Sequence, residues 1–334
     1  MINIKKIGLT ALAGSLVAVS AYAGELSVSG AAKMTYTANT GNEDTEADGS
    51  RFGLNNAVTF SGSGELDNGH IVSLSHTIDA DAATNALSSS ILTYDMGDLG
   101  KITYNQDSAT MGIEVIDDLT PTADEEVFNG IDAGQTTTNE APVGYANGSG
   151  ATGFNYNYSA IDGVSIDIGY NPKTTSSNVD DGGVSGDGAQ KSSQSIAIQY
   201  TAIDGLNIYG GTGEEGSGTT VNDVDTYGVK YAFGPLTVGV QRTDIDIADS
   251  SADLETTAFG VAFAVNDNLS ISYGESETEE DGTTTDQEST AFGVSYTMGS
   301  MKLTGIMANM DNIGGSTADV DDVSGYEIGL SFTF

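Results

Sequence analysis

The 334-residue sequence contains no cysteine, no tryptophan and only two histidines. Without cysteine, disulfides and thiolate metal sites are excluded, so backbone pairing has to supply the stability of the fold. His70 and His76 are the only imidazole bases that a Ser-His-Asp type of site could use, and no serine stands out as a candidate nucleophile. We therefore expect no enzyme and no bound cofactor.

Basic residues are also scarce, because 10 Lys and Arg stand against 48 Asp and Glu, a formal net charge of −38. The acids concentrate in polar stretches at 39–50, 172–192 and 276–287. Such a charge repels nucleic acid and anionic surfaces, which leaves cations as natural partners. A solvated surface or a disordered chain is the simpler alternative for acidic proteins in general.

Long apolar runs are missing after the first residues. The apolar stretch 7–19 follows Lys5-Lys6 and precedes Ala21-Tyr22-Ala23, the order of a secretory signal peptide. We assign 1–23 to a cleaved signal, which leaves 24–334 as one domain of 334 − 23 = 311 residues and a charge of 8 − 48 = −40. A helical membrane protein is excluded, because a spanning helix needs about 20 apolar residues.

What the chain does contain is alternation with a period of two, which is typical of strands whose side chains face two environments. The last segment places Tyr326, Ile328, Leu330, Phe332 and Phe334 on one face and small or polar residues on the other. A soluble sandwich usually carries long charged side chains on its polar face. Small residues instead suit a hydrated lumen, and segments of about ten alternating residues are typical of membrane barrels.

Sixteen alternating segments can be counted between turn signals. They lie at 25–37, 51–65, 70–78, 90–96, 101–107, 152–159, 164–171, 194–201, 206–212, 225–233, 236–246, 255–265, 269–275, 288–298, 301–310 and 324–334. Tight connections alternate with long ones, which predicts short periplasmic turns and long external loops. The predicted fold is an all-β, closed antiparallel transmembrane β-barrel of 16 strands, since backbone groups in lipid cannot stay unpaired.

The tight connections are rich in Gly, Asn and Asp, which favour the positive φ angles that such turns need. They lie at 67–69, 97–100, 161–163, 204–205, 234–235, 266–268 and 299–300. The longest connection, 108–150, requires an explanation in a compact domain, and folding into the lumen is one.

Three further motifs carry a family resemblance. Residues 49–54 read GSRFGL, residues 65–69 read ELDNG, and residues 97–106 read GDLGKITYNQ. With the Phe-ended last strand, they resemble the general porins of Gram-negative bacterial outer membranes over nearly all of residues 24–334. The resemblance implies a homotrimer of 16-stranded barrels whose long third loop, 108–150, folds into the lumen as a constriction. It also implies that Tyr326, Ile328, Leu330, Phe332 and Phe334 form the signal for the barrel assembly machinery.

By position in that loop, five acids are the candidate constriction residues: Asp117, Asp118, Asp124, Glu125 and Glu126. Simple solvated loop acids are the alternative. By strand parity, the candidate pore-wall bases are Lys33, Arg51, Lys101 and Lys230, with Lys302 a further candidate. A charge on the lipid side would cost about 2–4 kcal/mol at mid-membrane, which supports this parity. Arg51 could equally form a salt bridge at the rim, and Arg242, whose parity points outward, requires an interfacial position.

Seven tyrosines at or near strand ends fit an interfacial girdle, although tyrosine is also common in ordinary strands: Tyr36, Tyr94, Tyr104, Tyr158, Tyr170, Tyr200 and Tyr231. Dense external acids suit diffuse Ca²⁺ binding, although the best local string, 44–49, lacks the final bidentate Glu of a calcium loop. The sequence thus predicts an outer-membrane diffusion channel for small hydrophilic solutes that prefers cations and needs no cofactor. An acidic, calcium-stabilised surface adhesin without a pore is the alternative from another class.

Overall fold

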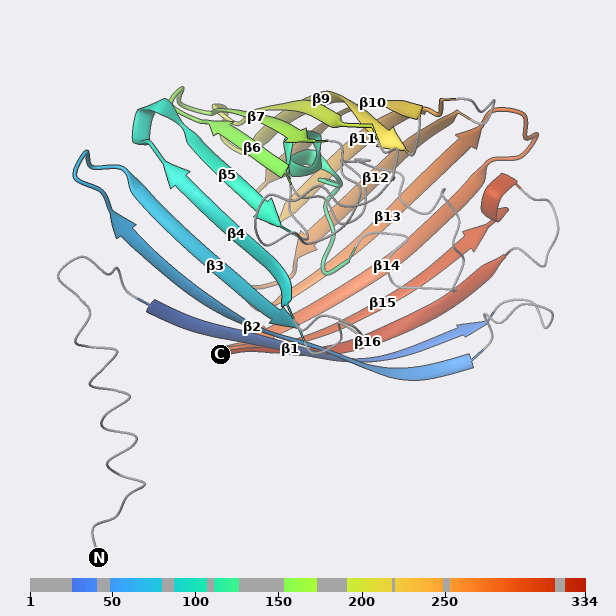
Figure 1. Ribbon diagram of the computed structural model, residues 1–334. Coiled ribbons are helices and arrows are strands. Elements are labelled where there is room, and N and C mark those ends of the chain that lie inside the picture. Colours follow the sequence, from blue (N-terminus) through green and yellow to red (C-terminus); the bar gives the residue numbers. More distant parts are fainter. Residues whose placement is uncertain are drawn as a thin grey trace, which may run out of the picture.

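A computed structural model describes residues 26–40, 49–79, 87–106, 111–125, 153–172, 191–217, 220–248, 253–315 and 322–334. Within them, 16 strands form one closed antiparallel barrel in which each strand pairs with its neighbours in sequence (Figure 1). The predicted fold class is confirmed. The proposed signal peptide, Glu126 and the calcium string apart from Gly49 lie outside the described residues.

The strands are β1 (Leu26–Thr40), β2 (Gly49–Glu65), β3 (Ile71–Asp79), β4 (Leu87–Asp95), β5 (Lys101–Gln106), β6 (Gly153–Tyr158), β7 (Val164–Asn171), β8 (Ser193–Tyr200), β9 (Leu206–Ser217), β10 (Thr220–Phe233), β11 (Leu236–Asp246), β12 (Leu254–Ala264), β13 (Leu269–Glu280), β14 (Gln287–Met298), β15 (Met301–Asp311) and β16 (Val323–Thr333). Three short 3₁₀ turns accompany them: η1 (Gly97–Leu99), η2 (Gly112–Ile116) and η3 (Ile313–Gly315). No helix among the described residues is long and apolar enough to cross a membrane.

The first and last strands close the barrel. Ten residue pairs join β1 to β16, from Ala31 opposite Thr333 to Thr40 opposite Ser324. The backbones of Gly30 and Phe334 also exchange two hydrogen bonds, of 2.7 and 2.9 Å. Closure leaves no unpaired strand edge, which a bilayer demands of any spanning sheet.

The tight turns use glycine as predicted in most places. Gly69 has a φ of +82° and Gly234 a φ of +58°, where other residues would be strained. The turn at 266–268 is different, and the expected positive φ of its Asn or Asp is wrong: Asn312 is the only non-glycine with positive φ among the described residues. There, the side chain of Asn266 accepts the N–H groups of Asn268 and Leu269 at 2.9 and 3.0 Å.

One expected external loop is mostly strand. The segments at 206–212 and 225–233 predict a loop between them, but β9 and β10 stay paired as far as Ser217 opposite Thr220. Polar residues such as Glu214 and Asp223 sit on the outer face of this extension. Polar residues also lie on the inner face there, where Glu215 and Asn222 are 5% and 7% exposed, so the alternation of apolar and polar residues ends and the sequence pattern underestimates strand length.

The outer surface of the barrel is apolar away from the external strand ends. Phe259, Phe292 and Ile328 are 41–50% exposed, whereas their inward neighbours Ala258 and Ala291 are 2% and 6% exposed. The seven tyrosines named above share the outward parity of these residues. Aromatic and aliphatic side chains that face outward on strands of this length are the lipid-facing surface of a membrane barrel.

Candidate functional site

The segment 111–125, which follows β5, lies inside the ring of strands (Figure 1). Its backbone N–H groups bond to side chains of the inner wall on several strands. Gly112 donates to Asn155 Oδ1 of β6 at 2.9 Å, and Ile113 donates to Ser195 Oγ of β8 at 3.1 Å. Farther along, Ala123 donates to Ser272 Oγ of β13 at 2.9 Å. The segment therefore follows the inner wall across many strands instead of crossing the open lumen.

An apolar cluster holds the start of this segment. Ile113 and Ile116 of η2 are at most 1% exposed and pack against inward side chains of β8 to β12: Ala197, Tyr209, Val224, Ile245 and Leu254. Our expectation that the inner face carries only small or polar residues is wrong in this region. The large inward residues lie where the loop covers them, and their burial contributes roughly 25 cal/mol per Å² of apolar surface.

Glycines in the wall make room for the loop at its closest approach. A Cβ on Gly239 of β11 would lie 2.7 Å from Pro121 Cδ, and one on Gly260 of β12 would lie 2.7 Å from the Pro121 carbonyl oxygen. Such distances are well below van der Waals contact, so Pro121 can sit at this depth only because both positions lack a side chain.

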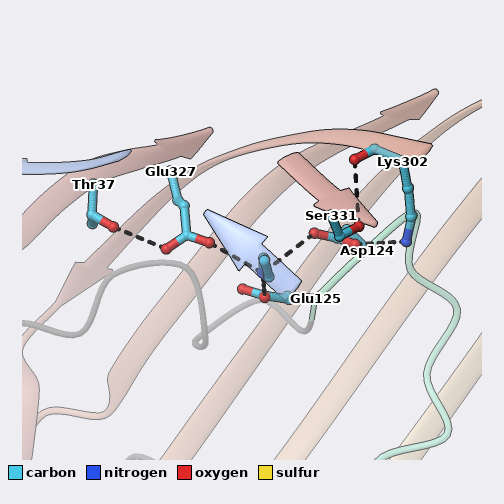
Figure 2. Close-up of polar contacts among 7 residues, drawn as sticks. Thr37, Asp124, Glu125, Lys302, Glu327 and Ser331 are labelled. Atoms are coloured by element: carbon cyan, nitrogen blue, oxygen red, sulfur yellow. Dashed lines mark hydrogen bonds and ion pairs between the residues drawn. The ribbon is translucent and has the colours of Figure 1, made fainter. Parts of the chain in front are cut away.

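At the end of the segment, acids of the loop meet bases of the wall (Figure 2). Lys302 Nζ of β15 donates to Asp124 Oδ1 at 2.6 Å. Lys33 of β1 forms an ion pair with Glu125, lies 3.2 Å from Glu327 Oε1 of β16, and lies 4.0 Å from Asp124 Oδ2. Three carboxylates thus share two ammonium groups, a formal charge of 2 − 3 = −1. We call these five residues the loop-tip cluster.

The environment of Glu125 disfavours its charged form. Burial raises the pKa of this carboxyl, Lys33 lowers it, and Glu327 and Asp124 raise it again, so that it titrates above the ordinary glutamate range. The neighbouring strands also hold Glu327, whose Oε2 accepts the Thr37 hydroxyl at 2.9 Å. Because Lys33 and Glu327 lie on β1 and β16, the cluster spans the strand pair that closes the barrel (Figure 2).

The other candidate residues are more dispersed. Asp118 Oδ1 accepts the N–H and the hydroxyl of Thr120, at 2.7 and 2.6 Å, and Asp117 is exposed just after η2. On the inner face, Lys101 lies 3.9 Å from Asp95, whereas Lys230 pairs in register with Asn207 and Arg51 with Thr37 near the external end of β2. The structure therefore brings Asp124, Glu125, Lys33 and Lys302 together, whereas Asp117, Asp118, Arg51, Lys101 and Lys230 lie outside the loop-tip cluster.

Sequence reasoning missed Glu327 and Gln241. Glu327 was visible as the one charged residue on the small-residue face of the last strand. Gln241 of β11 is 1% exposed and bonds to the loop between Ile116 and Leu119. No local pattern singles out this glutamine, since its partners in the loop lie more than a hundred residues away.

Several residues singled out in the sequence lie on the outer face of the barrel. Arg242 lies on the outer face and forms ion pairs with Asp244 and Glu255. His76 lies on the outer face of β3, opposite Phe60 and Ser90. In the last strand, Tyr326, Ile328 and Phe332 are 40–50% exposed on the outer face. In the part of the chain that the structure describes, no group of three or more His, Asp or Glu could hold a metal ion.

An apolar outer surface, a closed ring of strands and a loop lodged against the inner wall define a transmembrane channel barrel. Comparison with known protein families agrees with this class. The family profile for Gram-negative porins matches residues 8–334, so the chain belongs to that family. Membership places the protein in the outer membrane of a Gram-negative bacterium, and both family and fold indicate a channel rather than an enzyme.

Solved structures share the fold at low sequence identity. A substituted porin of Rh. blastica matches with a TM-score of 0.65 and 14% identity, covering 93% of this chain and 100% of that one. An outer membrane protein of Vibrio cholerae with one loop deleted has a TM-score of 0.65 and 16% identity, covering 93% and 99%. A second Rh. blastica porin variant has a TM-score of 0.63 and 18% identity, covering 93% and 100%. No curated protein matches the sequence.

Proposed function

We propose that the chain forms a passive diffusion channel for small hydrophilic solutes that prefers cations. The observation that carries this proposal is the segment 111–125, which follows the wall of the lumen, with Asp124 and Glu125 against Lys302 and Lys33 of that wall. Passage needs no cofactor, because the gradient of the solute drives it. The narrowing is attributed to loop 108–150, with Asp117, Asp118, Asp124, Glu125 and Glu126 as its acids.

Two charge arguments support the cation preference. The loop-tip cluster carries a surplus carboxylate next to water, and the chain as a whole carries 48 acids against 10 bases. In a narrow passage, carboxylates that line the wall attract cations and repel anions. The wall bases Lys33, Arg51, Lys101 and Lys230 reduce this field, and Lys33 does so directly at the loop.

The ion preference is tested by the reversal potential of the purified protein in a planar bilayer with a KCl gradient. We expect the sign that corresponds to K⁺ passing more readily than Cl⁻, most strongly at low salt where screening is weak. An anion-selective reversal potential would overturn the cation preference. Swelling of liposomes in small sugars tests diffusion itself, since an adhesin without a pore would cause none.

The remaining features of the proposal concern export and assembly. We propose that residues 1–23 are removed as a signal peptide, that the outward residues of β16 ending at Phe334 are read by the assembly machinery, and that the mature chain is a homotrimer. Mass spectrometry of the exported chain tests removal of the signal peptide. A Phe334→Ser variant tests the assembly signal, and cross-linking in native membranes tests the homotrimer. Diffuse Ca²⁺ binding by external acids is tested by calorimetric titration.

A further inference from the structure

Gln241 of β11 is a hydrogen-bond hub between the inner wall and the loop. Its Oε1 accepts the backbone N–H of Leu119 at 3.0 Å, and its Nε2 donates to the carbonyl of Ile116 at 2.8 Å and to that of Asp117. One side chain thus bonds to three backbone groups within four residues of the loop, at the end of η2.

Wall residues fix the orientation of this amide. Tyr209 of β9 donates its hydroxyl to Gln241 Oε1 at 2.8 Å, and Gln241 Nε2 lies 3.0 Å from Thr226 Oγ1 of β10. Thr226 in turn bonds to Thr243 at 2.7 Å. Because Tyr209, Thr226 and Thr243 are all at most 3% exposed, the amide cannot rotate without leaving buried polar groups unpaired.

The chemistry of the hub requires an amide. The loop offers two carbonyl acceptors and one N–H donor, so its partner must donate and accept from one planar group. A carboxylate cannot donate, and an aliphatic side chain can do neither. Serine, threonine and tyrosine carry a single hydroxyl, which cannot reach all three loop groups.

The hub also lies at the middle of the docked segment. On one side of it Ile113 and Ile116 pack into the apolar cluster, and on the other side Pro121 lies against Gly239 and Gly260. We infer that Gln241 is the positioning residue that holds the constriction loop at its depth in the wall, and that it thereby sets the size limit of the channel. This inference rests on the proposed diffusion function.

The test replaces Gln241 by Leu, which keeps the approximate size and removes every hydrogen bond of the amide. The matched control is Gln199→Leu on the inner face of β8, since Gln199 accepts Asn207 Nδ2 at 3.1 Å and belongs to the same wall. We expect Gln241→Leu to spend about tenfold more time outside the main conductance level in single-channel recordings. The size limit in liposome swelling should shift as well, while Gln199→Leu behaves like the parent.

A cross-link separates loop movement from damage to the barrel. The chain contains no cysteine, so Ala123→Cys with Ser272→Cys creates one thiol pair where the loop already bonds to β13. In the Gln241→Leu background, oxidation of this pair to a disulfide should restore the current noise of the parent. Reduction of the disulfide should bring the altered noise back. If Gln241→Leu does not assemble, Gln241→Glu, which loses both donors but keeps the shape, replaces it.

The outcomes are distinct. Parental noise and parental size limit in a well-assembled Gln241→Leu or Gln241→Glu channel would overturn the inference and leave the diffusion function intact. Altered noise that the oxidised cross-link does not correct would also overturn it, since the effect would then come from the wall. A parent protein without any conductance would overturn the proposed function instead.

Discussion

Asp223 of β10 lies directly opposite Asp246 of β11 on the outer face of the barrel, and Glu214 of β9 lies opposite Asp223 on the other side. A second row on the same face joins carboxylates of four adjacent strands: Asp225, Asp244, Glu255 and Glu279. Arg242 pairs with Asp244 and Glu255 within that row. Like charges in directly opposed positions weaken strand pairing, so this register makes the strand ends sensitive to salt.

Asp223→Asn should therefore stabilise the barrel at low ionic strength, because it relieves two opposed carboxylate pairs. We expect a gain of about 0.5 kcal/mol in the free energy of unfolding, given that all three side chains are exposed to solvent. The gain should shrink in molar NaCl. Urea unfolding in lipid vesicles at both salt concentrations measures it. Asp267→Asn in a tight turn is the control, and equal effects of the two substitutions would argue against the register explanation.

A glycine of the inner wall that lies close to the loop leads to a second prediction, about conductance. Gly260→Ala places a Cβ 2.7 Å from the Pro121 carbonyl oxygen, so the loop must move towards the lumen. We expect lower single-channel conductance and slower entry of the larger sugars in liposome swelling. Gly62→Ala serves as control because no atom lies within 4 Å of the added Cβ. A Gly260→Ala channel with unchanged conductance would show that the loop does not limit the passage there.

Acid should weaken the cation preference through Glu125. The pKa of this group is raised by burial and by Glu327 and Asp124, against the effect of Lys33. As pH falls through that raised pKa, protonation takes the loop-tip cluster from −1 to 0, and K⁺ selectivity should fall at a pH above the ordinary glutamate range. Reversal potentials recorded against pH measure the step.

Protonation of Glu125 lowers the K⁺ selectivity but raises the stability of the fold. A folded-state pKa above the unfolded value means that the folded chain binds more protons between the two values, so this group contributes more stability as pH falls through that interval. Protonation of Glu125 therefore does not unfold the barrel, and a loss of selectivity in this pH interval has to come from the change in charge. Glu125→Gln should lack the step, and a step that persists in this variant would assign the titration to another group.

Much of the fold followed from local pattern. The alternation around residues such as Phe259 and Ile328 depends on a physical difference between lipid and water, and it identified all 16 strands. The boundaries of β9 and β10 were missed, because pairing there continues above the apolar belt, where polar residues occur on both faces and the alternation is lost.

The site was less accessible to sequence reasoning. Parity placed Lys33 on the inner face, but its contact with Glu125 joins residues 92 positions apart. Gln241 bonds to loop groups 122 to 125 positions away. Contacts of this kind depend on the path of a loop along the wall, which no periodicity encodes. Glu327 could have been suspected, since a carboxylate on a strand face of glycine and serine requires a partner.

The central claim is that alternate side chains face lipid and a water-filled lumen, with the loop tip inside. Because the chain has no cysteine, single-cysteine variants test it directly. In an open channel in a bilayer, a membrane-impermeant thiol reagent should react with Glu125→Cys and reduce the current in steps, while Phe292→Cys on the outer face should leave the current unchanged. An unaltered current for Glu125→Cys together with blockage through Phe292→Cys would contradict the account.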